Sequence, residues 1–222
     1  MKGRRHLQIE LNPRRCRRLV LAVVLLPLWA EVLYRVLGPL NFSLPPERYP
    51  EALALALVHW GGAALALVWP AHEVLRREAS GERAWWQGQG RGTDFQLLAV
   101  LAPCLGALLL GGLALWWWAG WHGASVSAAA WGGALLRLAT IAVASLLLVQ
   151  LLPRMAWVLI AGALWLAVSH LPAVLVAGQP PALAWMLRLF PDLSHPGAGT
   201  VSYLAAYLLL ASLLAAKRYP AP

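Results

Sequence analysis

The sequence predicts an all-α, polytopic membrane protein with six transmembrane helices. Of its 222 residues, 60% are hydrophobic and 12% are charged, and the mean hydropathy is +0.64. Soluble domains are roughly 45–50% apolar and about 25% charged. A soluble protein of this length does not have a core large enough to bury so much apolar surface, whereas a lipid bilayer solvates that surface. Soluble enzymes, nucleic-acid-binding modules and disordered regulators are therefore largely excluded.

The apolar residues gather in six runs, each near the roughly 20 residues that a helix needs to cross a bilayer. The runs are continuous rather than alternating, which favours helices over a closed barrel. Between the fourth and fifth runs stand only Pro153 and Arg154, which predicts a tight helical hairpin. The predicted spans are 19–38, 52–70, 96–118, 128–152, 155–177 and 200–216.

The basic residues predict the orientation of these spans. Residues 1–18 form a basic arm with seven Lys and Arg against one acid, Glu10. With the N-terminus in the cytoplasm, the inner segments hold 14 basic residues and the outer loops only two, Arg48 and Arg188. This asymmetry predicts that both termini are cytoplasmic and that the arm lies against anionic lipid of a bacterial inner membrane. The net charge of +9 therefore indicates orientation rather than a nucleic-acid partner.

The chain divides into the basic arm, residues 1–18, and one transmembrane domain, residues 19–218. The longest inner loop, residues 71–95, carries four basic and four acidic residues, and its first part favours a helix that Gly81 can end. The longest outer segment, residues 178–199, contains an apolar piece at 182–190 that is too short to span. We expect that piece to be re-entrant or interfacial.

Three charged residues lie within the predicted spans, where charge is costly and usually faces protein or water. Glu31 and Arg35 are four residues apart and can pair on one helix face. They are either polar contacts on a translocation path or a helix-end pair that reaches toward the interface. Arg137, about ten residues into the fourth span, needs a partner: a substrate, a lipid headgroup, a backbone carbonyl or a buried acid.

His59 and His170 lie in the second and fifth predicted spans, and two histidines on facing helices can hold haem. Trp116, Trp117, Trp118 and Trp121 mark the outer end of the third span and predict an interfacial aromatic belt. Glycine pairs at 61–62, 111–112 and 132–133 predict close helix contacts. The sequence shows neither zinc-ligand spacing nor a nucleophile with a base, so we expect no metal site and no catalytic residues.

The order of these segments resembles the membrane subunit of a type-2 ABC transporter, the permease class with an ABCG-like (type V) exporter fold. The resemblance covers about residues 10–218 and is mainly topological. Two short motifs add to it: Arg77-Glu-Ala-Ser-Gly-Glu82 is similar to the family's coupling region, and Leu189-Phe-Pro-Asp192 resembles a Phe-Pro element after the fifth span. In two respects the sequence departs from the pattern. Asp94-Phe95 stands where a basic residue often begins the third span, and tryptophan is unusually dense.

The resemblance implies a permease that dimerises with itself or a paralogue and works with a separate ATPase, which alone holds ATP and Mg. It implies that residues 71–95 include a coupling helix, that the basic arm is interfacial, and that a lipid-like substrate is exported past the re-entrant segment. The implied re-entrant residues are Phe190, Pro191 and Asp192, and the implied coupling residues are Arg76, Arg77, Glu78, Gly81, Glu82 and Arg83. Two alternatives remain: an accessory subunit of a membrane complex that binds haem or quinone through His59 and His170, and a lipid-modifying enzyme.

Overall fold

The computed structural model describes residues 13–38, 45–82, 93–152, 154–170, 190–193 and 195–218. The regular elements in these ranges are all helical. Four helical stretches are long and apolar enough to cross a membrane: Pro46–Ala79, Leu97–Trp121, Ala128–Leu151 and Ala198–Lys217. The chain is therefore an all-α protein with the character of an integral membrane protein, as the composition predicts.

The elements follow the predicted runs closely and differ from them mainly at their ends. The first helix begins six residues before the predicted span, within the basic arm, and the second continues well past residue 70. The fifth ends at Ser169, and residues 171–177 of that prediction lie outside the described ranges. The elements are α2 (Pro13–Leu37), η2 (Pro46–Arg48), α3 (Tyr49–Ala56), the π turn η3 (Leu57–Gly61), α4 (Gly62–Ala79), α6 (Thr93–Trp121), α7 (Ala128–Leu151), α8 (Met155–Ser169) and α11 (Ala198–Arg218).

Local sequence accounts for several helix ends. Ser127 accepts a hydrogen bond from the Ala130 amide at 3.2 Å and so caps the start of α7. Gly81 follows the end of α4 with φ +69°, a conformation that glycine adopts without strain, and it confirms the predicted helix stop. α7 ends at Leu151 and α8 begins at Met155, so the predicted hairpin is present, although Pro153 itself lies outside the described residues.

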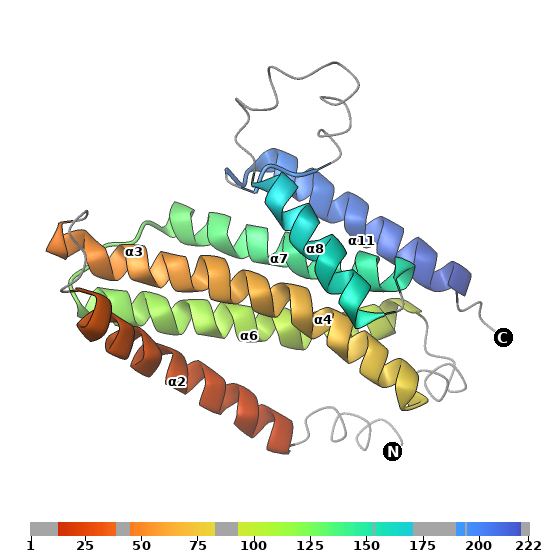
Figure 1. Cartoon of the computed structure of the whole chain (residues 1–222), viewed down its shortest axis with the longest axis horizontal. Coiled ribbons are helices and arrows are strands. Elements are labelled where there is room, and N and C mark those ends of the chain that lie inside the picture. Colours follow the sequence, from red (N-terminus) through yellow and green to blue (C-terminus); the bar gives the residue numbers. More distant parts are fainter. Residues whose placement is uncertain are drawn as a thin grey trace.

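Helix α7 forms the centre of the bundle. It packs most extensively against α4 on one side and α11 on the other, while α2 contacts mainly α6 (Figure 1). Its fully buried side chains include Leu138, Ile141, Leu146 and Val149. Ser145 of α7 donates a hydrogen bond to the Leu67 carbonyl of α4. Such small polar bridges hold helices together in lipid, where apolar burial gives little preference for one neighbour over another.

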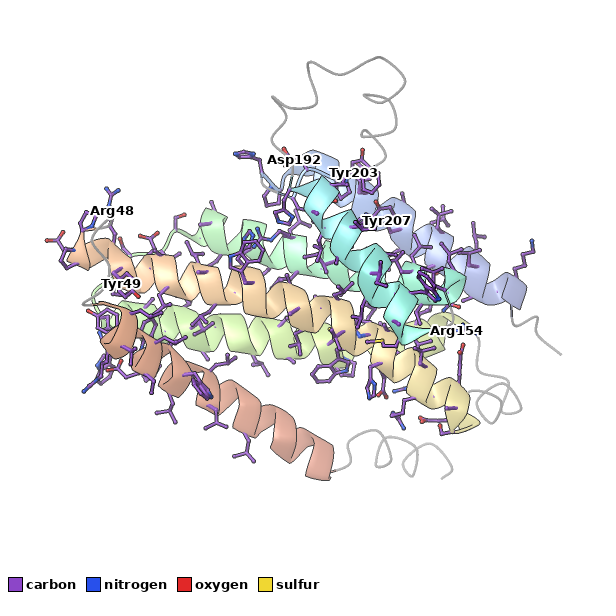
Figure 2. The ribbon with its side chains drawn as sticks, viewed as in Figure 1. Arg48, Tyr49, Arg154, Asp192, Tyr203 and Tyr207 are labelled. Atoms are coloured by element: carbon purple, nitrogen blue, oxygen red, sulfur yellow. The ribbon has the colours of Figure 1, made fainter. Side chains whose placement is uncertain are left out.

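The two ends of the bundle carry different residues. Figure 2 shows Arg48 and Tyr49 at one end and Arg154 toward the other; we call these the Tyr49 end and the Ala79 end. α6 and the continuous run from Pro46 to Ala79 connect the two ends (Figure 1). α8 and α11 lie against the half of α7 nearer the Ala79 end. The structure thus places Arg48 and Arg154, which the topology assigns to opposite faces, at opposite ends of the bundle.

Candidate functional site

The Ala79 end of α4 carries a network of charged side chains. Glu73 accepts hydrogen bonds from Arg76 Nη2 at 2.8 Å and from Arg77 Nε at 2.9 Å. Arg76 Nη2 also reaches Glu82 Oε2 at 3.2 Å. Arg77 Nη2 donates to the Ala99 carbonyl of α6 at 3.4 Å. The network therefore braces the last turns of α4 and ties them to the first turns of α6.

The charges in this network stabilise one another. The helical stretch Pro46–Ala79 has 34 residues, and at 1.5 Å per residue its length exceeds the roughly 30 Å thickness of the hydrocarbon core. The charged turns from residue 72 onward therefore extend beyond that core. Burial alone raises the pKa of Glu73, but hydrogen bonds from Arg76 and Arg77 outweigh it and lower the pKa from 4.5 to about 2. The Glu73 hydrogen bond likewise raises the pKa of Arg76. Glu73 and Arg76 are therefore both charged at neutral pH.

The structure brings three of the six predicted coupling residues, Arg76, Arg77 and Glu82, into one network. Gly81 ends the helix and Glu78 is half-buried beside it, while Arg83 lies outside the described residues. Residues 72–79 are helical, as expected, but they continue α4 without a break rather than forming a separate interfacial helix. The central acid, Glu73, was not among the predicted residues, although its spacing of three and four from the two arginines indicates the pairing.

A second polar cluster lies at the Tyr49 end, around Glu31 of α2. Arg35 Nε lies 2.7 Å from Glu31 Oε1, which confirms the predicted pair. The other carboxylate oxygen accepts a hydrogen bond from Trp118 Nε1 at 3.1 Å and lies 2.8 Å from His122 Nε2. Tyr34 packs against the His122 ring, with centroids 4.7 Å apart. One carboxylate oxygen thus pairs within α2, and the other ties α2 to α6 and to His122.

The aromatic-belt prediction is wrong for one of its four tryptophans. Trp116, Trp117 and Trp121 are 47%, 62% and 77% exposed, as a lipid-facing belt requires, but Trp118 is only 4% exposed. Its indole turns inward because the Glu31 carboxylate gives the N–H a buried acceptor. His122, which the sequence places in an outer loop, directly follows α6 and joins the same carboxylate. The spacing of four residues between Trp118 and His122 indicates that the two side chains lie on the same helix face.

A third group of polar side chains lies where the π turn η3 meets the end of α8. His59, in the π turn, and His170, at the end of α8, have ring centroids 5.3 Å apart in an edge contact. Trp60 packs against His59, with centroids 4.9 Å apart. The proximity that a shared haem requires is present. However, the macrocycle would have to stand between the two rings, which here touch each other directly, so this arrangement does not fit a bis-histidine haem.

Arg137 of α7 belongs to the same region. Its side chain is 5% exposed, and its Nε has no hydrogen-bond partner among the described residues. The carbonyl or acid expected to bind it is therefore not found there. The next residue of α7, Leu138, packs on Gly62, which lies three residues after His59.

The described parts of the outer segment, 178–199, are residues 190–193 and 195–199, and they are irregular up to the start of α11 at Ala198. Pro191 and Leu193 are buried against the bundle, and the Leu193 amide donates to the Ser169 carbonyl at 2.9 Å. Asp192 is exposed and accepts a hydrogen bond from the His195 amide at 3.2 Å, near the start of α11 (Figure 2). Phe190 is half-buried. Residues 182–189 of the predicted re-entrant piece, 182–190, lie outside the described residues.

The described residues contain no group of three or more His, Cys, Asp or Glu side chains that could hold a metal ion. Comparisons of the chain with protein-family models, with curated proteins and with solved structures found no match.

Proposed function

We propose that this chain is the membrane permease subunit of an ATP-binding cassette transporter, with six spans and both termini in the cytoplasm. The observation that carries the proposal is the charged network at the Ala79 end, because it provides a polar surface at one end of an otherwise apolar bundle. The proposed partner is a separate ATPase that docks there and holds ATP and Mg. A second copy of the chain, or a paralogue, completes the transporter, and the cargo is a lipid-like molecule.

Continuity of the second span supports this function. Pro46–Ala79 runs without interruption from the Tyr49 end to the charged turns. Arg77 links those turns to the Ala99 carbonyl of α6, and Ser145 links α4 to α7. A force applied at the Ala79 end would therefore displace α4, α6 and α7 together. This is the mechanical property that a coupling element needs, and in this proposal the Ala79 end faces the cytoplasm.

The test is purification of the full chain in mild detergent together with its bound partners. We expect an ATP-hydrolysing subunit to co-purify. In reconstituted complexes, replacing both Glu78 and Glu82 by Ala should weaken docking about two- to thirtyfold, because each surface charge pair that they form with the partner contributes about 0.2–1 kcal/mol. Coupled ATPase activity should fall with it.

A matched control replaces Glu47 and Glu51 by Ala, which removes the same charge at the Tyr49 end. This control should leave docking and ATPase activity unchanged. A chain that purifies without any ATPase would contradict the proposed function. Equal activities of the two double variants would contradict docking at the Ala79 end.

A further inference from the structure

The polar cluster around Glu31 contains a histidine in direct contact with an acid. His122 Nε2 lies 2.8 Å from Glu31 Oε2, and the two side chains are 22% and 29% exposed. Among the described residues, Glu31 is the one acidic group that pairs with His122. His122 directly follows α6 at the Tyr49 end, so its exposed part lies where the chain leaves the bundle and water can reach it. A histidine in this position can exchange a proton with the solution on that side.

The surroundings of His122 attract a positive charge. The Glu31 carboxylate supplies an opposite charge in direct contact. The His122 amide donates to the Trp118 and Ala119 carbonyls at 3.3 and 3.1 Å, which fixes the residue at the C-terminal end of α6, where the helix dipole favours cations. The rings of Tyr34 and Trp118 have centroids 4.7 and 4.9 Å from that of His122, within the range of cation–π contacts. All three groups therefore interact more favourably with a protonated ring than with a neutral one.

The contact between Glu31 and His122 joins two helices. Glu31 belongs to α2, whereas His122 follows α6, and Trp118 of α6 donates to the same carboxylate oxygen at 3.1 Å. Within the described residues α2 packs mainly on α6, and to a smaller extent on α3. There the Tyr34 ring meets the Tyr49 ring, with centroids 5.7 Å apart. The strength of the Glu31–His122 contact therefore bears directly on how tightly α2 is held to the bundle.

We propose that His122 and Glu31 form a pH-sensitive latch, which holds α2 more tightly on α6 when the solution at the Tyr49 end becomes acidic. A neutral ring donates at most one hydrogen bond to the carboxylate, whereas a protonated ring donates that bond and adds the attraction of opposite charges. Arg35 holds the second oxygen of Glu31, and its side chain is 78% exposed, so water screens its repulsion of the histidinium.

The sign of the effect follows from this geometry. The added attraction is present at acidic pH and is lost as the pH rises through about 5 to 8, the range in which histidine side chains titrate. The latch responds to the solution on the side of the membrane that the Tyr49 end faces. It depends on the contacts of α2 with α6 and not on the proposed ATPase partner or cargo.

The test compares the unfolding of the purified full chain with that of His122→Gln, in mixed micelles with increasing sodium dodecyl sulfate, from pH 8 to pH 5. Glutamine keeps a hydrogen-bond donor for Glu31 but gains no proton in this range. We expect the ratio of the two unfolding equilibrium constants to change about two- to thirtyfold in favour of the wild type as the pH falls, as for a histidinium at a helix C-terminus. His72→Gln is the matched control, because His72 is exposed at the Ala79 end; its ratio to the wild type should not change with pH.

A distance measurement tests the same latch in a chain that keeps both residues, and so does not require the variant to fold. Nitroxide labels are placed at the exposed residues Leu25 of α2 and Leu109 of α6. The distribution of distances between the labels should be narrower at pH 5 than at pH 8, because the tighter latch restricts α2. A ratio of unfolding constants for His122→Gln that stays constant from pH 8 to pH 5, or a distance distribution that does not change with pH, would overturn the proposal.

Discussion

The contact between α4 and α7 can be tested with two adjacent glycines. Gly61 and Gly62 both have helical dihedral angles, with φ −66° and −62°, so alanine fits the backbone at either position. A Cβ at Gly61 would meet nothing within 4 Å, whereas a Cβ at Gly62 would lie 2.8 and 3.0 Å from the two terminal methyl groups of Leu138. The two Gly→Ala variants therefore differ almost only in this contact.

The expected magnitudes follow from the surroundings. Replacing glycine by alanine within a helix gains roughly 0.5–1 kcal/mol, and this gain applies to both variants. Leu138 is only 1% exposed, so it has no free space into which to swing. Overpacking a core of this kind costs about 1–3 kcal/mol. We therefore expect Gly61→Ala to be slightly stabilised and Gly62→Ala to be about 1–3 kcal/mol less stable than Gly61→Ala.

The assay is reversible unfolding of the purified chain in mixed micelles by increasing sodium dodecyl sulfate, followed by circular dichroism. A third variant, Leu138→Ala, removes the two methyl groups, so adding Gly62→Ala to it should cost less than in the wild type. Equal stabilities of the two glycine variants, or an unchanged cost in the Leu138→Ala background, would refute the packing of α7 on this turn of α4.

Three further predictions concern single hydrogen-bonded side chains. Trp118→Phe should lower the free energy of unfolding by about 1.5–3 kcal/mol, because it removes a buried donor to a carboxylate, while Trp121→Phe, exposed to lipid, should change it little; equal losses would contradict the inward orientation. The stabilisation from Glu73, whose pKa is lowered from 4.5 to about 2, should be present above pH 4.5 and lost as the pH falls toward 2. Unfolding measured across this range should show that loss in the wild type and not in Glu73→Gln. Ser145→Ala should cost about 0.6–1.7 kcal/mol by removing the bond to the Leu67 carbonyl; full stability of that variant would show that the bond adds nothing.

Hydropathy predicted the positions of the helices well because each apolar run is bounded by polar or helix-ending residues. The 128–152 run, for example, became Ala128–Leu151, with Ser127 as its cap. Four of the six predicted spans correspond to helices that are long and apolar enough to cross a membrane. The first and fifth stay predictions, since α2 carries several charged residues and α8 has 15 residues in its described part.

Side-chain orientation was harder to predict, since a helix that is apolar on all sides carries no periodic signal to mark its buried face. For this reason Trp118 could not be separated from its three exposed neighbours. The Glu31–Arg35 pair was predictable because both residues are on one helix and spacing alone sets their distance. The meeting of His59 with His170 joins two helices far apart in sequence, and its contact geometry depends on a π turn that propensity does not reveal.

The π turn also bears on how the second span can change in length. A π turn holds one residue more than the α-helical turn that it replaces. Deleting a single residue within Leu57–Gly61 would therefore leave a regular α-helix whose two halves keep their present faces toward the bundle. A deletion between this turn and Ala66 would rotate all following residues by about 100° and turn the buried Ala66 and Ala71 away from their present neighbours. This turn is thus the position at which a one-residue deletion in the second span preserves the match between its two halves and their neighbours.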